Sequence, residues 1–196
     1  MKYADLEPPL CWQQVFGNSA PVEIEIGFGK CGFLLEIAAQ NPATNFVGIE
    51  LSRKYYRKGV AKVQRAGLPN IKLLWGEAFH LFERYVPDHS LAQIHINCPD
   101  PWPKKRHAKR RLVQAELVAL FAQKSNPAGS IEIATDAEAY MLQVQEIFRA
   151  NALYAMTSAH TSNQQGSIRP YSSDYERMFL DAGKTIHYVK YSRRTD

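Results

Sequence analysis

The sequence predicts an α/β fold in which a mostly parallel sheet carries helices on both faces. Short apolar or alternating segments typical of strands recur along the chain, and most are separated by segments with helical periodicity. The expected strands are residues 22–26, 45–50, 71–75, 91–97, 131–134, 153–159 and 185–191. The expected helices are residues 33–40, 53–66, 77–85, 111–124, 137–150 and 174–182.

The first strand leads directly into a glycine-rich turn. Residues 22–26 alternate apolar and acidic side chains, residues 27–32 read Gly-Phe-Gly-Lys-Cys-Gly, and a helical pattern follows. A strand, a glycine turn and a helix in this order are typical of a nucleotide-binding loop in a doubly wound sheet. Gly27 and Gly29 permit positive φ and a close approach of ligand to backbone. Glu50 ends the second strand at roughly the 20-residue spacing where a carboxylate accepts from a ribose diol.

The fourth strand ends in a proline-rich loop that carries one acid. Asn97-Cys98 is followed by Pro-Asp-Pro-Trp-Pro and then by a cationic run that ends at Arg111. Three prolines stop the strand and predict a stiff loop. Asp100 therefore lies at a strand end beside a positive surface. The pattern predicts a small polar pocket that a polyanion approaches.

The second half of the chain continues the alternation. The helix at 111–124 has an apolar stripe and is expected to end at Asn126-Pro127 and Gly129. Thr135 and Asp136 can cap the helix that begins at residue 137. A polar loop is expected at residues 161–172 before the last helix and strand.

Size and composition indicate one domain of 196 residues with a short lead-in at residues 1–20. The formal net charge of +5 favours an anionic partner. The three cysteines form no Cys-x-x-Cys pair and the six histidines show no ligand spacing, so we expect no metal. No signal peptide and no apolar run near the ~20 residues of a membrane span are present, so we expect a cytoplasmic protein without membrane contact.

Taken in order, several of these motifs resemble the bacterial tRNA (guanine-N7)-methyltransferase family. They are Glu25-Ile26-Gly27-Phe28-Gly29-Lys30, Gly48-Ile49-Glu50, the run from Pro99 to His107 with Lys109-Arg110-Arg111, Thr135-Asp136, and Tyr175-Glu176 before Gly183. The resemblance covers residues 12–196, and the Pro-Asp-Pro-Trp-Pro-Lys-Lys-Arg-His run is its most specific part. It implies a Rossmann-like class I methyltransferase fold with a mostly parallel seven-stranded sheet. S-adenosylmethionine would be the methyl donor and a guanine in the tRNA variable loop the acceptor.

The resemblance also implies roles for individual residues. The donor would be bound by Glu25, Gly27, Gly29, Glu50, Glu77 and Asp100, and Asp100 would also be the catalytic residue. The RNA would be bound by Lys104, Asp136, Ser173, Asp174, Tyr175 and Glu176. The partner would be tRNA, with the enzyme a monomer or a homodimer. Cys31, Glu77, Cys98 and Ser173 depart from the residues usual in the family.

Three other functions remain open from the residues. An exocyclic-amine methyltransferase also carries an Asp-Pro-Pro-Tyr-like loop after the fourth strand, and analysis of the methylated product separates the two chemistries. A basic RNA-binding domain without catalysis would fail to bind S-adenosylmethionine. A dehydrogenase would match the Gly-x-Gly-x-x-Gly spacing at Gly27 and would bind NADH.

Overall fold

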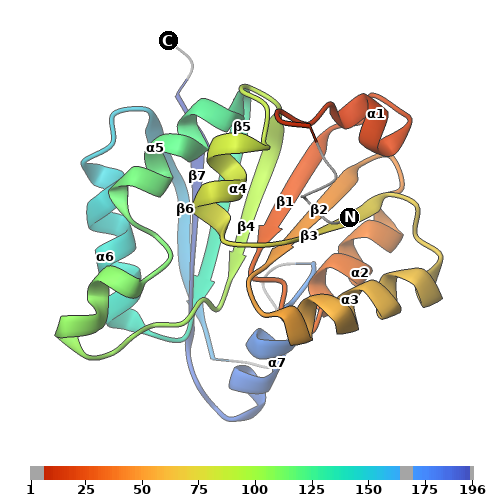
Figure 1. Cartoon of the computed structure of the whole chain (residues 1–196). Coiled ribbons are helices and arrows are strands. Elements are labelled where there is room, and N and C mark those ends of the chain that lie inside the picture. The colour runs from red at the N-terminus through yellow and green to blue at the C-terminus, as the bar shows by residue number, and fades with distance from the viewer. Residues whose placement is uncertain (1–6, 164–169, 195–196) are drawn as a thin grey trace.

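The computed structural model describes residues 7–163 and 170–194, and shows one seven-stranded sheet in the order β3-β2-β1-β4-β5-β7-β6 between two layers of helices (Figure 1). The strands are β1 (Val22–Ile26), β2 (Asn45–Glu50), β3 (Ile71–Trp75), β4 (Leu91–Asn97), β5 (Ser125–Thr135), β6 (Tyr154–Ser162) and β7 (Ile186–Arg193). The helices are α1 (Trp12–Phe16), α2 (Gly32–Gln40), α3 (Arg53–Ala66), α4 (Ala78–Arg84), α5 (Ala115–Lys124), α6 (Glu138–Arg149), α7 (Asp174–Asp181) and the 3-10 helix η2 (Lys105–Arg110).

The expected α/β sandwich and the mostly parallel sheet are confirmed. Strands β1 to β5 pair in parallel, and β7 runs antiparallel to both of its neighbours, β5 and β6. The first four strands have the predicted bounds. Parallel pairing places the carboxyl ends of β1, β2, β3 and β4 at one edge of the sheet, near α7 in Figure 1.

The two faces of the sheet are covered by different helices. Ile24, Ile94 and Ile131 belong to the larger apolar cluster, which they share with buried side chains of α4, α5 and α6. Phe46 and Leu73 belong to a second cluster with side chains of α2, and α3 packs against it. Figure 1 shows α2 and α3 on one side of the sheet and α5 and α6 on the other. Burying apolar surface on both faces is what a parallel sheet requires.

The elements around the proline-rich loop differ from the prediction. Helix α5 begins at Ala115 instead of residue 111, and part of the expected loop forms η2. The cause is Arg111, whose guanidinium binds back to the loop and keeps residues 111–114 outside the helix. Strand β5 begins at Ser125, and its register with β4 shifts where Leu91 pairs with Ser125 but Gln93 pairs with Ser130. The shift accommodates residues 126–129, including a proline that cannot donate to the ladder.

Smaller differences lie at the ends of the chain. The lead-in contains α1, which the sequence did not predict, and β6 extends through Ser162 into the expected polar loop. Residues 164–169 of that loop lie outside the described residues. Within residues 7–163 and 170–194, no helix has the length and apolar character needed to cross a membrane. The same residues contain no group of three or more His, Cys, Asp or Glu side chains placed to hold a metal ion.

Gly48 is required by close packing in the middle of β2. A Cβ atom there would lie 2.5 Å from Leu34 Cδ1, 2.6 Å from Leu73 Cδ2 and 2.7 Å from Phe28 Cδ1. Three side chains would have to move, so we expect Gly48→Ala to lower the free energy of unfolding by about 1–3 kcal/mol. Urea unfolding followed by circular dichroism measures this change. The exposed Ala61→Ser variant on α3 is the control, and equal stability of the two variants would contradict the packing argument.

Candidate active site

A cavity of about 1020 Å³ opens at the carboxyl ends of the parallel strands. It is lined by residues from the glycine turn, from the ends of β2, β3 and β4, from the proline-rich loop and from α7. Seven of the predicted site residues lie in its wall: Gly27, Gly29, Glu50, Glu77, Asp100, Asp136 and Tyr175. Glu25, Lys104, Ser173, Asp174 and Glu176 are not part of this wall. The fold therefore brings together segments that are 158 residues apart in the sequence, from residue 26 to residue 184.

The glycine turn is held by the end of β2. Gly27 has φ +77° and Gly29 has φ +49°, a left-handed conformation that glycine adopts without strain. The Gly27 amide donates to the Ile49 carbonyl at 2.8 Å, and the Gly29 amide donates to Glu50 Oε2 at 2.9 Å. The other oxygen of Glu50 accepts from the Ser52 amide at 2.7 Å. Glu50 thus joins the glycine turn to the start of α3 at the cavity wall.

Cys31 completes the turn in an unusual conformation. It has φ +67° at the N-cap of α2, where a side chain is strained and glycine would be favoured. Its side chain is fully buried in the cluster formed with Phe33 and Leu34. Burial, reinforced by the charge of Glu25, raises the pKa of Cys31 to about 12. The thiol therefore stays protonated and packs as a small apolar group.

Glu77 faces the cavity from the end of β3. Its carboxylate accepts from the amides of Phe79 at 3.0 Å and His80 at 2.9 Å, which makes it the N-cap of α4. Each carboxylate oxygen has two lone pairs, so capping leaves Glu77 able to accept a further hydrogen bond from a ligand. Capping also fixes the direction of the carboxylate beside Glu50 and Gly76 in the wall.

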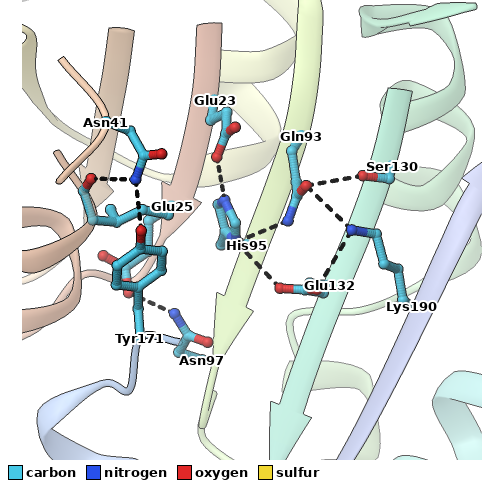
Figure 2. A network of polar contacts seen from close by, with 11 residues as sticks. Glu23, Glu25, Asn41, Gln93, His95, Asn97, Ser130, Glu132, Tyr171 and Lys190 are labelled. Atoms are coloured by element: carbon cyan, nitrogen blue, oxygen red, sulfur yellow. Dashed lines mark hydrogen bonds and ion pairs between the residues drawn. The ribbon is translucent and has the colours of Figure 1, made fainter. Parts of the chain in front are cut away.

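Glu25 lies behind the wall and is hydrogen-bonded to Asn97. The Asn97 Nδ2 donates to Glu25 Oε1 at 2.9 Å, and the two side chains are 5% and 2% exposed (Figure 2). Asn97 itself lines the cavity. The sequence analysis missed this residue, although its position as the last residue of β4, directly before the proline-rich loop, was a usable signal.

The same face of the sheet carries a row of polar side chains farther from the cavity. His95 Nε2 lies 2.7 Å from Glu23 Oε2, and its Nδ1 lies 3.8 Å from Glu132 Oε2. Lys190 Nζ lies 3.5 Å from Glu132 Oε1, and Figure 2 shows the chain of contacts across β1, β4, β5 and β7. A separate cavity of about 220 Å³ lies against this row. Each carboxylate of the row thus has a cationic or imidazole partner inside the protein, as is usual for buried polar groups.

Asp100 is presented by a loop that the side chains of Arg110 and Arg111 contact. Cys98 and Trp102 have φ of +49° and +41°, so the chain turns sharply on both sides of Asp100. Arg111 Nε donates to the Pro101 carbonyl at 2.8 Å, and its guanidinium also contacts Gln143. The guanidinium of Arg110 lies 5.1 Å from the centre of the Trp102 ring. Asp100 is exposed and lines the cavity.

The cationic run after this loop divides into two roles. Arg111 is an internal brace, as described above, so it is not available to bind phosphates as the sequence suggested. Lys109 and Arg110 are exposed at the wall of the cavity. Lys104 is exposed at the N-cap of η2, outside the wall.

Helix α7 covers the glycine turn. Asp174 Oδ2 accepts from the Gly32 amide at the start of α2, at 2.9 Å. The Tyr175 hydroxyl donates to the Tyr55 hydroxyl at 3.2 Å, and Lys30 Nζ lies 5.6 Å from the Tyr175 ring centre. The hydrogen bond to Tyr55 raises the pKa of Tyr175 to about 12, so its hydroxyl is neutral. Two of the four predicted residues of this segment thus face the turn.

The other two residues of this segment form the cap of α7. Ser173 Oγ accepts from the Glu176 amide at 3.1 Å, while Glu176 Oε2 accepts from the Ser173 amide at 3.3 Å. Glu176 is 0% exposed, and its Oε1 accepts from the Tyr188 hydroxyl at 2.8 Å. This capping box satisfies the first amides of the helix and ties it to β7. Ser173 and Glu176 therefore fix the position of Asp174 and Tyr175.

Asp136 lines the cavity from the end of β5. Lys184 Nζ lies 2.6 Å from Asp136 Oδ2 and also lines the cavity. The cap predicted from Thr135 and Asp136 is not formed: the N-cap of α6 is Ala137 without a side-chain cap hydrogen bond, and Thr135 Oγ1 accepts from the Ala137 amide at 3.2 Å ahead of the helix. The carboxylate of Asp136 is consequently directed to the cavity and to Lys184 instead of the helix.

Comparison with known proteins identifies a family and a fold. Residues 19–189 match the model of a family described as putative methyltransferase. A tRNA (guanine-N(7)-)-methyltransferase of Geobacter metallireducens is 35% identical over 192 residues, 98% of this chain and 91% of that protein. The enzyme of the same name from Thermotoga maritima is 34% identical, over 92% of this chain and 56% of that protein. The alignment thus spans little more than half of that relative.

Solved structures support the fold. The 16S rRNA methyltransferase KamB superposes with a TM-score of 0.70 and 14% identity, covering 94% of this chain and 93% of that chain. An antibiotic-related methyltransferase superposes with a TM-score of 0.67 and 15% identity, covering 92% of both chains. At these identities the likeness establishes a methyltransferase-like fold and nothing about the substrate.

We expect Asn97→Leu to destabilise the protein. The substitution removes the donor to a carboxylate that is 2% exposed, and hydrogen bonds to buried charged groups contribute about 1.5–3 kcal/mol. Urea unfolding at pH 7 should show a loss of free energy of unfolding in that range. An Asn126→Leu variant, at a partly exposed position in the shifted region of β5, is the control. If both variants lose the same small amount, the bond to Glu25 has no special role.

Proposed function

This chain belongs to the putative methyltransferase family whose named relatives are tRNA (guanine-N7)-methyltransferases, and from that membership we propose that it transfers a methyl group from S-adenosylmethionine to N7 of a guanine in tRNA. Within the tRNA, we propose a guanine of the variable loop as the acceptor. One observation carries the proposal: the carboxylate-bearing loop around Asp100, the glycine turn and Glu50 all line one cavity. A methyl donor bound on the turn and a base placed beside Asp100 would therefore meet.

The wall of the cavity suits a cationic nucleoside. Its volume of about 1020 Å³ accommodates a donor together with a base. Gly29 lies in the wall and packs closely under Tyr175, because a Cβ there would lie 3.0 Å from Tyr175 Cε2. Glu50 and Glu77 provide fixed acceptors for hydroxyl and amino groups, and their charge favours a positive ligand. We propose that Glu25 acts on the donor through its buried charge and through Asn97.

The chemistry needs alignment more than proton transfer. S-adenosylmethionine supplies an electrophilic methyl group on a positively charged sulfur. Guanine N7 has an in-plane lone pair and no proton, so no general base is needed at that atom. The purine gains positive charge as the bond forms. The Asp100 carboxylate stabilises that charge, directly or by accepting from the guanine N1–H and amino group.

The remaining predicted residues would position the RNA. Asp136 and Tyr175 line the cavity, and we propose that they contact the base or its ribose. Asp174 holds α7 against α2, while Ser173 and Glu176 hold it against β7. Lys104 is exposed beyond the wall and would reach a phosphate. The target base has to leave its stack to enter the cavity.

The direct test is incubation of unmodified tRNA with labelled S-adenosylmethionine. Digestion to nucleosides should give labelled N7-methylguanosine. Reduction followed by aniline should cleave the RNA at one position, which sequencing places in the variable loop. Label in an exocyclic-amine nucleoside would replace the proposal by the alternative chemistry. If no methylated nucleoside forms and the protein does not bind S-adenosylmethionine, the result would favour an RNA-binding domain without catalysis.

Asp100→Asn tests the role of the carboxylate. The substitution keeps the size of the side chain and removes its charge, so we expect the rate of methylation to fall by about 10²–10³-fold. Binding of tRNA should remain close to that of the wild type, because Asp100 contributes no cationic contact. Methylation rates under single-turnover conditions and tRNA binding by fluorescence anisotropy measure the two effects.

The matched control for this variant is Glu83→Gln. Glu83 is an exposed carboxylate in α4 near the opposite edge of the sheet, and its loss changes the net charge by the same amount. It should methylate at the wild-type rate. A wild-type rate in Asp100→Asn would remove this carboxylate from the mechanism.

A further inference from the structure

Helix α3 carries a face of positive charge that the proposed function has not yet used. Five cations of this helix are exposed and a sixth, Lys62, is half-buried. The exposed ones are Arg53, Lys54, Arg57, Lys58 and Arg65. The helix contains no aspartate or glutamate. Its other side packs through Tyr56, Val60 and Val63 onto the cluster above β2 and β3. The helix therefore presents one apolar face to the protein and one cationic face to solvent.

This charge pattern is unfavourable for the helix itself. Arg53 and Lys54 occupy the first turn, where the helix dipole is positive and acids are preferred. Arg53 and Arg57, and likewise Lys54 and Lys58, are four residues apart, and like charges at that spacing repel. Cations in the first turn and like charges four residues apart both lower the stability of a helix, and their combination in one helix is typical of a functional surface.

Within the described part of the chain, several cations elsewhere have acidic partners, in contrast to those of α3. Lys124 is paired with Asp88 at 2.6 Å, Lys184 with Asp136 at 2.6 Å, and Arg177 with Glu36 at 2.9 Å. Across residues 7–163 and 170–194, no ion pair joins Lys54, Arg57 or Lys58 to a carboxylate. Arg53 stacks over Trp75 at 5.7 Å. The three unpaired cations can therefore bind an anion without first breaking an internal contact.

The position of the helix relates this face to the cavity. Leu51, Ser52 and Tyr55, at the start of α3, line the cavity wall. Lys109 and Arg110 line it from the loop after β4. Because β1 lies between β2 and β4 in the sheet, the two basic segments approach the cavity from either side of β1. Figure 1 shows α3 at the same end of the molecule as α7.

We propose that Lys54, Arg57 and Lys58 form a second phosphate-binding surface for tRNA, which holds the RNA backbone on the α3 side of the cavity while Lys109 and Arg110 hold it on the other. The inference rests on the proposed function, because it takes tRNA as the substrate. Backbone contacts on two sides fix the RNA strand across the opening, so that one base faces Asp100. Such contacts position the RNA and carry no sequence information.

The test compares tRNA binding of the wild type with that of the triple variant Lys54→Gln, Arg57→Gln, Lys58→Gln. Fluorescence anisotropy with labelled, unmodified tRNA is recorded from 50 to 200 mM KCl. Each lost phosphate contact makes the slope of log K against log salt less steep by about 0.7–0.9, so the loss of three contacts should change the slope by about 2–3. Affinity for S-adenosylmethionine, measured by calorimetry, should be unchanged. Thermal unfolding should occur at the same or a higher temperature, since like-charge repulsion in α3 is relieved.

A matched variant separates a local surface from overall charge. Arg65→Gln, Arg84→Gln, Arg149→Gln removes the same three charges from exposed residues in the last turns of α3, α4 and α6. These helices lead into the amino ends of β3, β4 and β6, at the edge of the sheet opposite the cavity. The control variant should keep a salt slope within about 0.5 of the wild type, because its arginines make no phosphate contact. Equal slopes for the two variants would overturn the proposal.

The outcome is independent of whether the proposed reaction occurs. If the wild type forms N7-methylguanosine and the α3 variant keeps the wild-type slope, the proposed function stands and the second surface is wrong. If the slope of log K against log salt becomes less steep in the α3 variant while the wild type forms no N7-methylguanosine, the second phosphate-binding surface stands and the proposed reaction is wrong. In the first case the phosphate contacts would belong to the segment around Lys109 alone.

Discussion

The hydrogen bonds of one carboxylate, Glu50, organise the candidate site. This side chain is 8% exposed and accepts from the Gly29 amide on one side and from the Ser52 amide on the other. It therefore ties the glycine turn to the first turn of α3 across the ends of two parallel strands. Because an unpaired amide in a buried turn is costly, the path of the turn is set by β2 before any ligand binds. The same carboxylate remains in the cavity wall, so one residue shapes the site and faces its ligand.

Much of the fold could be predicted because its strands have clear patterns. In β1, apolar residues alternate with acids, and in β4 isoleucines alternate with polar residues. Both strands bury apolar side chains against α4, α5 and α6, which sets the face that each strand presents to these helices. The start of β5 could not be predicted in this way. Residues 126–129 interrupt the pairing with β4 and contain turn-forming residues, so the local pattern indicated a loop where a shifted strand continues.

The candidate site could be predicted only where a residue type has one dominant use. The glycines at positive φ and the acid between prolines were found because few other residues serve there. Ser173 and Glu176 illustrate the opposite case. A serine followed three residues later by a glutamate also forms a capping box, and these two side chains are buried in one. The roles of Arg111 and Asn97 were not predicted for another reason: the groups that they contact, the Pro101 carbonyl and the Glu25 carboxylate, are brought close to them only by folding.

The distribution of charge explains how one surface can serve two ligands of opposite sign. The wall of the cavity contains the carboxylates of Glu50, Glu77, Asp100 and Asp136, although the chain as a whole has a net charge of +5. Acids concentrated in a concave wall attract a cationic nucleoside and repel phosphates. The same wall also contains Lys109 and Arg110, while Lys184 is paired with Asp136, so the RNA backbone would be met by cations of the wall and the donor by Glu50 and Glu77. We infer that this mixture of charges lets a cationic donor and a base of a polyanion occupy neighbouring parts of one cavity.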